Sequence, residues 1–103
     1  MNFYDEVYEL CKKIPKGKVS TYKEIGKAMN SRAYRAVGQA LRNNPYAPIV
    51  PCHRVLNSKG ELYGFNGKMN NKNLKDKEKL LLKEGVKVKN NKVIDFEKKL
   101  FKF

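Results

Sequence analysis

The chain has 103 residues, which is enough for one domain with a modest core and too few for two. Hydrophobic residues make up 41% of it, which excludes a natively disordered chain. The formal net charge of +13 favours a polyanionic partner, nucleic acid first and an anionic membrane surface second. One histidine and two cysteines are too few for a zinc site of the usual spacing, so we predict neither a metal nor another cofactor.

The amino-terminal stretch carries acidic rather than basic residues, and no apolar run reaches the length of a membrane span. We therefore expect no signal peptide and no membrane association. The expected location is the cytoplasm, at the nucleoid if the source is a prokaryote, and the expected state is a monomer.

Two amphipathic helices are predicted in the first 30 residues. The first runs from Phe3 to Lys13, with acids near its start and lysines near its end, as the helix dipole favours. Its apolar positions recur at helical spacing: Phe3, Val7, Leu10 and Ile14. The second runs from Tyr22 to Met29, and Glu24 is placed to complete a capping box with Thr21. The candidate N-caps are Ser20 and Thr21.

A third helix is predicted from Arg32 to Arg42, capped by Ser31, and the tight polar turn before it indicates a helix-turn-helix. Small residues alternate on this helix with long polar ones: Arg32, Arg35, Gln39 and Arg42. Such a face suits either close approach to nucleic acid or close helix packing with solvated arginines, and the charge favours the first. Gly38 costs about 1 kcal/mol in a helix interior, which indicates a steric reason for it.

Three chemically active side chains follow one another at Cys52, His53 and Arg54. A thiol beside an imidazole and a cation favours the nucleophilic thiolate. The alternative is a short core strand from Ile49 to Leu56, in which the cysteine acts as a small hydrophobe. On a strand, neighbouring residues face opposite sides, so a relay between thiol and imidazole needs a bridging water or a sharp turn.

A carboxylate is also expected to orient the imidazole. The candidates are Glu61 and Glu84, with a slight preference for Glu84 because it closes a leucine-rich helix.

The remaining segments predict short elements around this motif. Residues 61–67 interleave aromatics and glycines, which would either wall a base-sized pocket or form a plain connection. A polar loop over 68–75 precedes a helix from Asp76 to Lys83, with Gly85 as its C-cap. A hairpin follows over residues 86–94, and a terminal helix from Phe96 to Phe103. The predicted fold class is therefore mainly α, a small winged helix-turn-helix-like bundle with short β-strands and a hairpin.

The order of these segments resembles the O6-alkylguanine-DNA alkyltransferases, the methylated-DNA–protein-cysteine methyltransferase family. Pro51-Cys52-His53-Arg54-Val55 is similar to the active-site motif of that family. Residues 35–45 resemble its recognition helix and asparagine hinge, residues 20–22 the segment of its DNA-contacting tyrosine, and residues 81–85 the stretch with its buried glutamate.

The resemblance implies a single catalytic and DNA-binding domain over residues 1–103, without the amino-terminal domain common in the family. It implies a DNA repair enzyme that flips O6-alkylguanine out of duplex DNA and transfers the alkyl group irreversibly to Cys52, once per molecule. The implied catalytic residues are Cys52, His53, Glu84 and Tyr22. The implied DNA contacts are Arg35, Arg42, Gln39, Thr21 and Ser58. The implied base pocket comprises Val55, Phe65, Asn66 and Gly67, and Asn44 is the implied hinge.

Besides the missing amino-terminal domain, two departures from the family pattern stand out. Phe65 occupies a position where many members have tyrosine, and the stretch from Lys68 to Asp76 is longer than usual. Three other functions are considered: a lesion-binding module that shares the fold but lacks the reactive cysteine, a winged-helix regulator, and a Cys-His hydrolase. The presence of Cys52 favours alkyl transfer over a lesion-binding module that only flags alkylated guanine for other repair systems.

Overall fold

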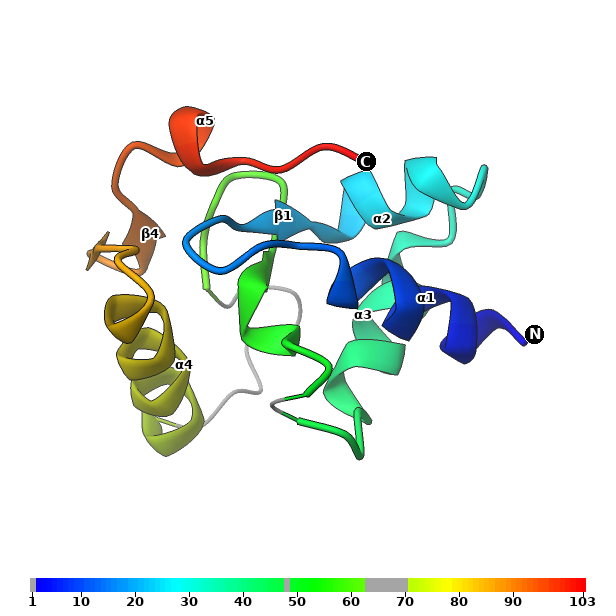
Figure 1. Ribbon diagram of the computed structural model, residues 1–103, viewed down its shortest axis with the longest axis horizontal. Helices are drawn as coiled ribbons and strands as arrows, with labels where there is room; N and C mark the ends of the chain where they lie inside the picture. The colour runs from blue at the N-terminus through cyan, green and yellow to red at the C-terminus, as the bar shows by residue number, and fades with distance from the viewer. Residues whose placement is uncertain (1, 48, 63–70) are drawn as a thin grey trace.

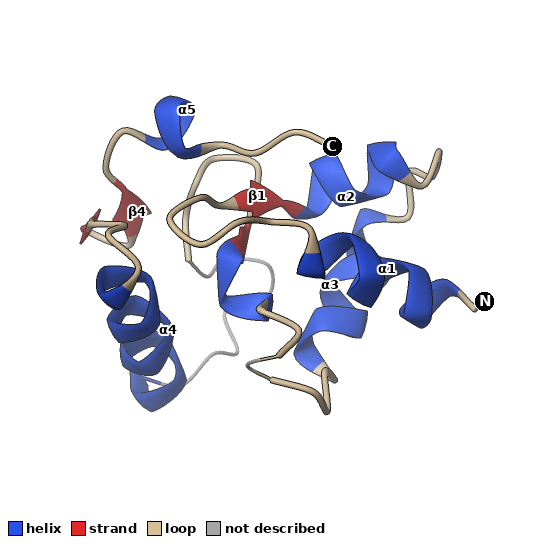
Figure 2. Cartoon of the chain, viewed as in Figure 1, coloured by secondary structure: helices blue, strands red, loops and turns tan. Residues whose placement is uncertain are grey.

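The computed structural model describes residues 2–47, 49–62 and 71–103. The described chain is mostly helical, which confirms the predicted fold class (Figures 1 and 2). The helices are α1 (Phe3–Lys12), α2 (Tyr22–Ala28), α3 (Tyr34–Arg42), α4 (Asn71–Lys83) and α5 (Phe96–Lys99), with a short 3₁₀ helix η1 (Cys52–Arg54). The strands are β1 (Ser20–Thr21), β2 (Val55–Leu56), β3 (Val88–Lys89) and β4 (Lys92–Val93).

Local capping sets the starts of the first two helices. The Asn2 side chain accepts a hydrogen bond from the Asp5 amide at 2.9 Å, and Thr21 Oγ1 accepts one from the Glu24 amide at 3.0 Å. Each bond satisfies an amide that the first helical turn leaves unpaired. The predicted cap at Thr21 is therefore confirmed, and both helices end within one residue of their predicted ends.

The turn between α2 and α3 differs from its prediction. Ser31 Oγ accepts a hydrogen bond from the Ala33 amide at 3.0 Å, and the Tyr34 amide bonds the Arg32 carbonyl at 2.8 Å. These bonds tighten the turn, because a serine hydroxyl offers the backbone an alternative to a helical turn. Helix α3 therefore begins at Tyr34, and the predicted start at Arg32 with Ser31 as cap is wrong.

Gly26 lets α3 pack against α2. A Cβ on it would lie 2.6 Å from the Tyr34 ring and 3.0 Å from the Ser31 carbonyl oxygen. We expect Gly26→Ala to lower the free energy of unfolding by about 1–3 kcal/mol, although alanine is the better helix former by about 1 kcal/mol. Urea unfolding measures this change, with the exposed Lys23→Ala as control. An unfolding midpoint at or above that of the wild type would contradict the prediction.

The predicted core strand from Ile49 to Leu56 is wrong except at its last two residues. Ile49 is 79% exposed, and Cys52 to Arg54 form η1. Only β2 is extended; it pairs in parallel with β1, with Val55 opposite Ser20. The turn arises because Pro51 cannot donate a ladder hydrogen bond and its carbonyl instead accepts one from the Arg54 amide at 2.9 Å.

Helix α4 begins at Asn71, so the predicted polar loop over 68–75 is wrong from residue 71 onward. It ends as predicted: Gly85 has φ +86°, and the Val86 amide reaches back to the Leu81 carbonyl at 2.9 Å. The β3–β4 hairpin is confirmed, and both of its turn residues, Asn90 and Asn91, have positive φ, as a two-residue turn requires.

The carboxyl-terminal segment pairs with the backbone just before β1. Helix α5 ends at Lys99 rather than at Phe103, because the chain then pairs with Val19: the Val19 amide bonds the Lys99 carbonyl at 3.0 Å, and the Phe101 amide bonds the Val19 carbonyl at 2.7 Å. One apolar cluster lies among α1, α2 and α3, and a second among β2, α4 and the hairpin. The segment carrying η1 and β2 runs between helices α1 to α3 on one side and α4 with the hairpin on the other (Figure 1).

Candidate active site and nucleic-acid surface

The turn at residues 52–54 presents its side chains in three directions. In a 3₁₀ helix successive residues are about 120° apart, whereas a strand alternates them. Cys52 is half-buried, His53 is buried at 6% exposure, and Arg54 is half-buried. The sharp turn that a thiol-imidazole relay needs is therefore present.

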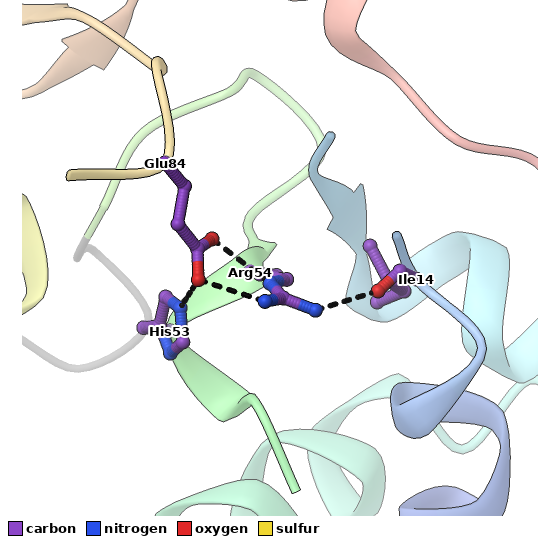
Figure 3. Close-up of polar contacts among 4 residues, drawn as sticks. All are labelled: Ile14, His53, Arg54 and Glu84. Carbon is purple, nitrogen blue, oxygen red and sulfur yellow. Dashed lines mark hydrogen bonds and ion pairs between the residues drawn. The ribbon is translucent and has the colours of Figure 1, made fainter. Parts of the chain in front are cut away.

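Glu84 joins this turn to the end of α4. The Arg54 guanidinium donates from Nε to Glu84 Oε1 at 2.9 Å and from Nη2 to Oε2 at 2.7 Å. Its Nη1 donates to the Ile14 carbonyl at 2.8 Å, just beyond α1. His53 Nε2 lies 3.0 Å from Glu84 Oε2 (Figure 3). Of the two candidate carboxylates, Glu84 is thus the one beside the imidazole, whereas Glu61 bonds Asn57.

The charges in this network fix the protonation of the imidazole. Burial raises the pKa of Glu84, but the hydrogen bonds from Arg54 and His53 outweigh it and hold that pKa below its usual value. Burial lowers the pKa of His53 below 6.5 and outweighs the attraction of Glu84. Because the carboxylate only accepts, His53 Nε2 donates to it, and Nδ1 of the neutral ring carries the lone pair that can take a proton.

Asn44 braces the loop that leads to Cys52. Its Nδ2 donates to the Val50 carbonyl at 2.8 Å, and its Oδ1 accepts from the Tyr46 amide at 2.9 Å. The Cys52 amide in turn bonds the Val50 carbonyl at 2.8 Å. The asparagine therefore ties the end of α3 to the turn that carries the thiol.

Thr21 ends β1 and Tyr22 begins α2, beside the strand β2 that follows the turn. Burial raises the pKa of Tyr22, which also lies within electrostatic range of Arg42 and Cys52, so its hydroxyl stays protonated. Thr21 is only 3% exposed and its hydroxyl caps α2. The structure thus gives Thr21 a buried position and a capping role, and its expected contact with DNA stays a prediction.

Helix α3 buries its apolar side and exposes its long polar residues. Val37, Ala40 and Leu41 are buried, whereas the expected DNA contacts on it are exposed: Arg35, Gln39 and Arg42. A Cβ on Gly38 would meet only the Tyr22 ring among the described residues, at 4.0 Å, which is an ordinary contact. Packing within the described chain therefore does not require a glycine at this position.

The structure describes only some of the other residues that were expected to contact DNA or the flipped base. Ser58 is exposed and Val55 is buried. Phe65, Asn66 and Gly67, expected to line a base pocket, lie outside the described residues. Within the described ranges, no helix is long and apolar enough to cross a bilayer, and no group of three or more His, Cys, Asp or Glu side chains is placed to bind a metal ion.

A comparison with protein families decides the relationship. Residues 2–86 match the model of the 6-O-methylguanine DNA methyltransferase, DNA binding domain. The chain belongs to this family. The match spans α1 through the end of α4, and so includes the Cys52 turn and Glu84.

Curated members of the methyltransferase family match over about half their own length. The methylated-DNA–protein-cysteine methyltransferase of Methanosarcina barkeri is 48% identical over 65 residues, which cover 62% of this chain and 41% of that protein. The Thermococcus kodakarensis protein of the same name is 43% identical over 86 residues, covering 82% and 45%. The chain thus spans about half the length of the curated relatives it matches.

Two solved structures of proteins bound to DNA share the methyltransferase fold. S. pombe Atl1, in complex with damaged DNA containing O6-carboxymethylguanine, matches with a TM-score of 0.84 and 30% identity, over 98% of this chain and 95% of that one. Mycobacterium tuberculosis OGT in complex with DNA matches with a TM-score of 0.68 and 39% identity, over 82% and 50%. The chain is similar to the first over nearly its whole length.

Sequence reasoning missed one residue beside the turn, Lys77. Its Nζ donates to the carbonyl oxygens of Val55 at 2.9 Å and Leu62 at 3.1 Å. The one signal was its spacing: it precedes Glu84 by seven residues, about two helical turns, which places it on the side of α4 from which Glu84 follows. Without the helix register, it could not be told from the other lysines nearby.

Proposed function

We propose that this chain repairs DNA by transferring the alkyl group of O6-alkylguanine to Cys52, as a methylated-DNA–protein-cysteine S-methyltransferase that acts once. The observation that carries the proposal is the half-buried thiol on η1, followed directly by an imidazole that Glu84 holds. Membership of the methyltransferase family supports it. The substrate is duplex DNA, in keeping with the charge of +13 and with the DNA-bound relatives.

DNA binds through α3 in this proposal. Arg35, Gln39 and Arg42 are exposed along the helix, and Arg35 fills the gap left in the base stack when the damaged guanine flips out. Ser58 contacts the backbone from the turn after β2. The flipped base enters beside Cys52 and Val55, and the resemblance to the family assigns Phe65, Asn66 and Gly67 to its pocket.

The transfer is a single displacement. The thiol proton passes through a water to His53 Nδ1, and the Cys52 thiolate attacks the alkyl carbon. A sulfur–carbon bond forms as the bond from that carbon to guanine O6 breaks, and the electron pair stays with the base. The Tyr22 hydroxyl, kept protonated by its raised pKa, donates a proton to the leaving guanine. The proton that His53 took from the thiol is released to solvent, and solvent returns one to Tyr22. The thioether is not reversed, so each molecule reacts once.

A second candidate function is a module that binds the lesion without transfer. The similarity to Atl1 favours it, because that match covers 98% of this chain, whereas the match to Mycobacterium tuberculosis OGT in complex with DNA covers 82%. The cysteine at position 52 favours transfer instead.

A labelled substrate tests the proposed function against this alternative. The protein is incubated with a duplex that carries O6-methylguanine with a labelled methyl group, and the adduct is located by peptide mass spectrometry. We expect one label per molecule, on Cys52. Tight binding of the lesion duplex with unlabelled protein would support the flagging module, and equal affinity for damaged and intact DNA would contradict both.

Gly38 tests whether α3 lies on DNA. Gly38→Ala should stabilise the fold by about 1 kcal/mol, because alanine is the better helix former and meets only an ordinary contact. If the helix approaches DNA closely, the added methyl group should weaken duplex affinity roughly tenfold, or about 1.4 kcal/mol. Urea unfolding and fluorescence anisotropy measure the two effects. The helical Gly26→Ala is the control, with the opposite expected sign in stability. Unchanged DNA affinity for Gly38→Ala would contradict a close approach of α3 to DNA at this position.

A further inference from the structure

Lys77 links two separated points of the backbone next to the thiol. Its ammonium donates to the Val55 carbonyl at 2.9 Å and to the Leu62 carbonyl at 3.1 Å. Val55 follows the Cys52 turn directly, and Leu62 precedes the segment that carries the expected base pocket. One side chain from α4 therefore fixes both ends of the segment 55–62.

The surroundings of this ammonium contain two thiols. Burial lowers the pKa of Lys77 to about 8, while Cys52 and Cys11, as anions, would raise it. Burial raises the pKa of Cys11 to about 12, so that thiol stays neutral. His53 is neutral as well, and the Arg54 guanidinium is already bonded to Glu84. Among the groups around Lys77, the Cys52 thiolate is thus the anion that its positive charge can stabilise.

Three other lysines of α4 lack this position. Lys75, Lys79 and Lys83 are exposed, whereas Lys77 is half-buried and satisfies two backbone carbonyls. An ammonium withdrawn from water costs free energy unless it is paired, and the two carbonyls supply only part of the compensation. The lowered pKa of Lys77 accords with this incomplete compensation, which a nearby anion would complete.

We infer that Lys77 is a positioning residue that holds the 55–62 segment and stabilises the Cys52 thiolate by its charge. The inference deepens the proposed function and rests on it in one respect, because it takes the thiolate as the attacking group. Lys77 itself contacts neither the alkyl carbon nor the base. Its effect is exerted through the cysteine and through the two carbonyls.

Thiol alkylation tests this role without DNA. In a Cys11→Ala background Cys52 is the only thiol, and iodoacetamide reacts with its thiolate: a sulfur–carbon bond forms and iodide leaves with the electron pair. The rate is followed from mildly acidic to alkaline pH for Lys77→Met, Lys77→Gln and Lys77→Arg, with the exposed Lys79→Met as matched control. Circular dichroism reports folding, and transfer from lesion DNA is measured in parallel.

We expect Lys77→Met to slow alkylation at neutral pH on the order of tenfold and to move the midpoint of the pH profile upward. Lys77→Gln, which keeps a donor for the carbonyls, should behave alike, whereas Lys77→Arg should restore most of the rate and Lys79→Met should match the parent. If Lys77→Met does not fold, Lys77→Gln carries the same comparison. A folded, uncharged variant with the parental pH profile would overturn the inference. A parent that is alkylated normally but takes no label from lesion DNA would overturn the proposed function alone.

Discussion

Replacing Cys52 by alanine is expected to abolish alkyl transfer and to leave affinity for lesion DNA within about threefold of the wild type, a change below 1 kcal/mol. The other thiol cannot substitute for it. Cys11 is fully buried, and burial raises its pKa to about 12. Because Cys52 is only half-buried, its truncation should cost less stability than the loss of a core side chain.

Label transfer and anisotropy with the same duplex measure the two quantities. Cys11→Ala is the matched control: it removes the other cysteine of the chain, so transfer should persist even if stability falls. Residual labelling of Cys52→Ala, or loss of labelling in a folded Cys11→Ala, would contradict the assignment of the nucleophile.

Much of the fold could be predicted from local chemistry. Thr21 caps α2, Gly85 ends α4, and Asn90 and Asn91 turn the hairpin, because each acts through neighbours within a few residues. The errors arose where distant contacts decide. The apolar run after Ile49 has the pattern of a strand, yet it turns at Cys52, where the chain must meet α1 through Ile14 and α4 through Glu84.

The candidate site was predictable only where its residues are neighbours in the sequence. Adjacent residues such as Cys52 and His53 form a pattern that sequence alone displays. Glu84 was one of two candidates until the structure placed it 3.0 Å from the imidazole. Lys77 was missed because its role depends on which lysine of α4 faces inward, and that follows from helix register and packing rather than from composition.

Replacing Glu84 by alanine is expected to lower the free energy of unfolding by about 3 kcal/mol, because it leaves a shielded guanidinium without its anion. The side chains of Glu84 and Arg54 are only 11% and 16% exposed, so water compensates little. The imidazole of His53 also loses the group that fixes its tautomer. Transfer should therefore slow on the order of 100-fold in protein that is still folded. Urea unfolding and single-turnover transfer measure these effects.

Glu84→Gln removes the charge of the side chain and keeps its shape. The lowered pKa values predict the direction in which stability and transfer rate change with pH. The pKa values of Glu84 and His53 both lie below their usual 4.5 and 6.5, so the folded state binds fewer protons than the unfolded one. Their contribution to stability is present above those usual values and is lost as pH falls through the lowered ones. Because glutamine does not titrate, Glu84→Gln should lose less stability than the wild type as pH falls. Because Glu84 raises the pKa of His53 against burial, its neutralisation should also move the acid limb of the transfer rate to lower pH. An acid limb that stays in place, or moves upward, would show that the histidine beside Glu84 is not the proton acceptor.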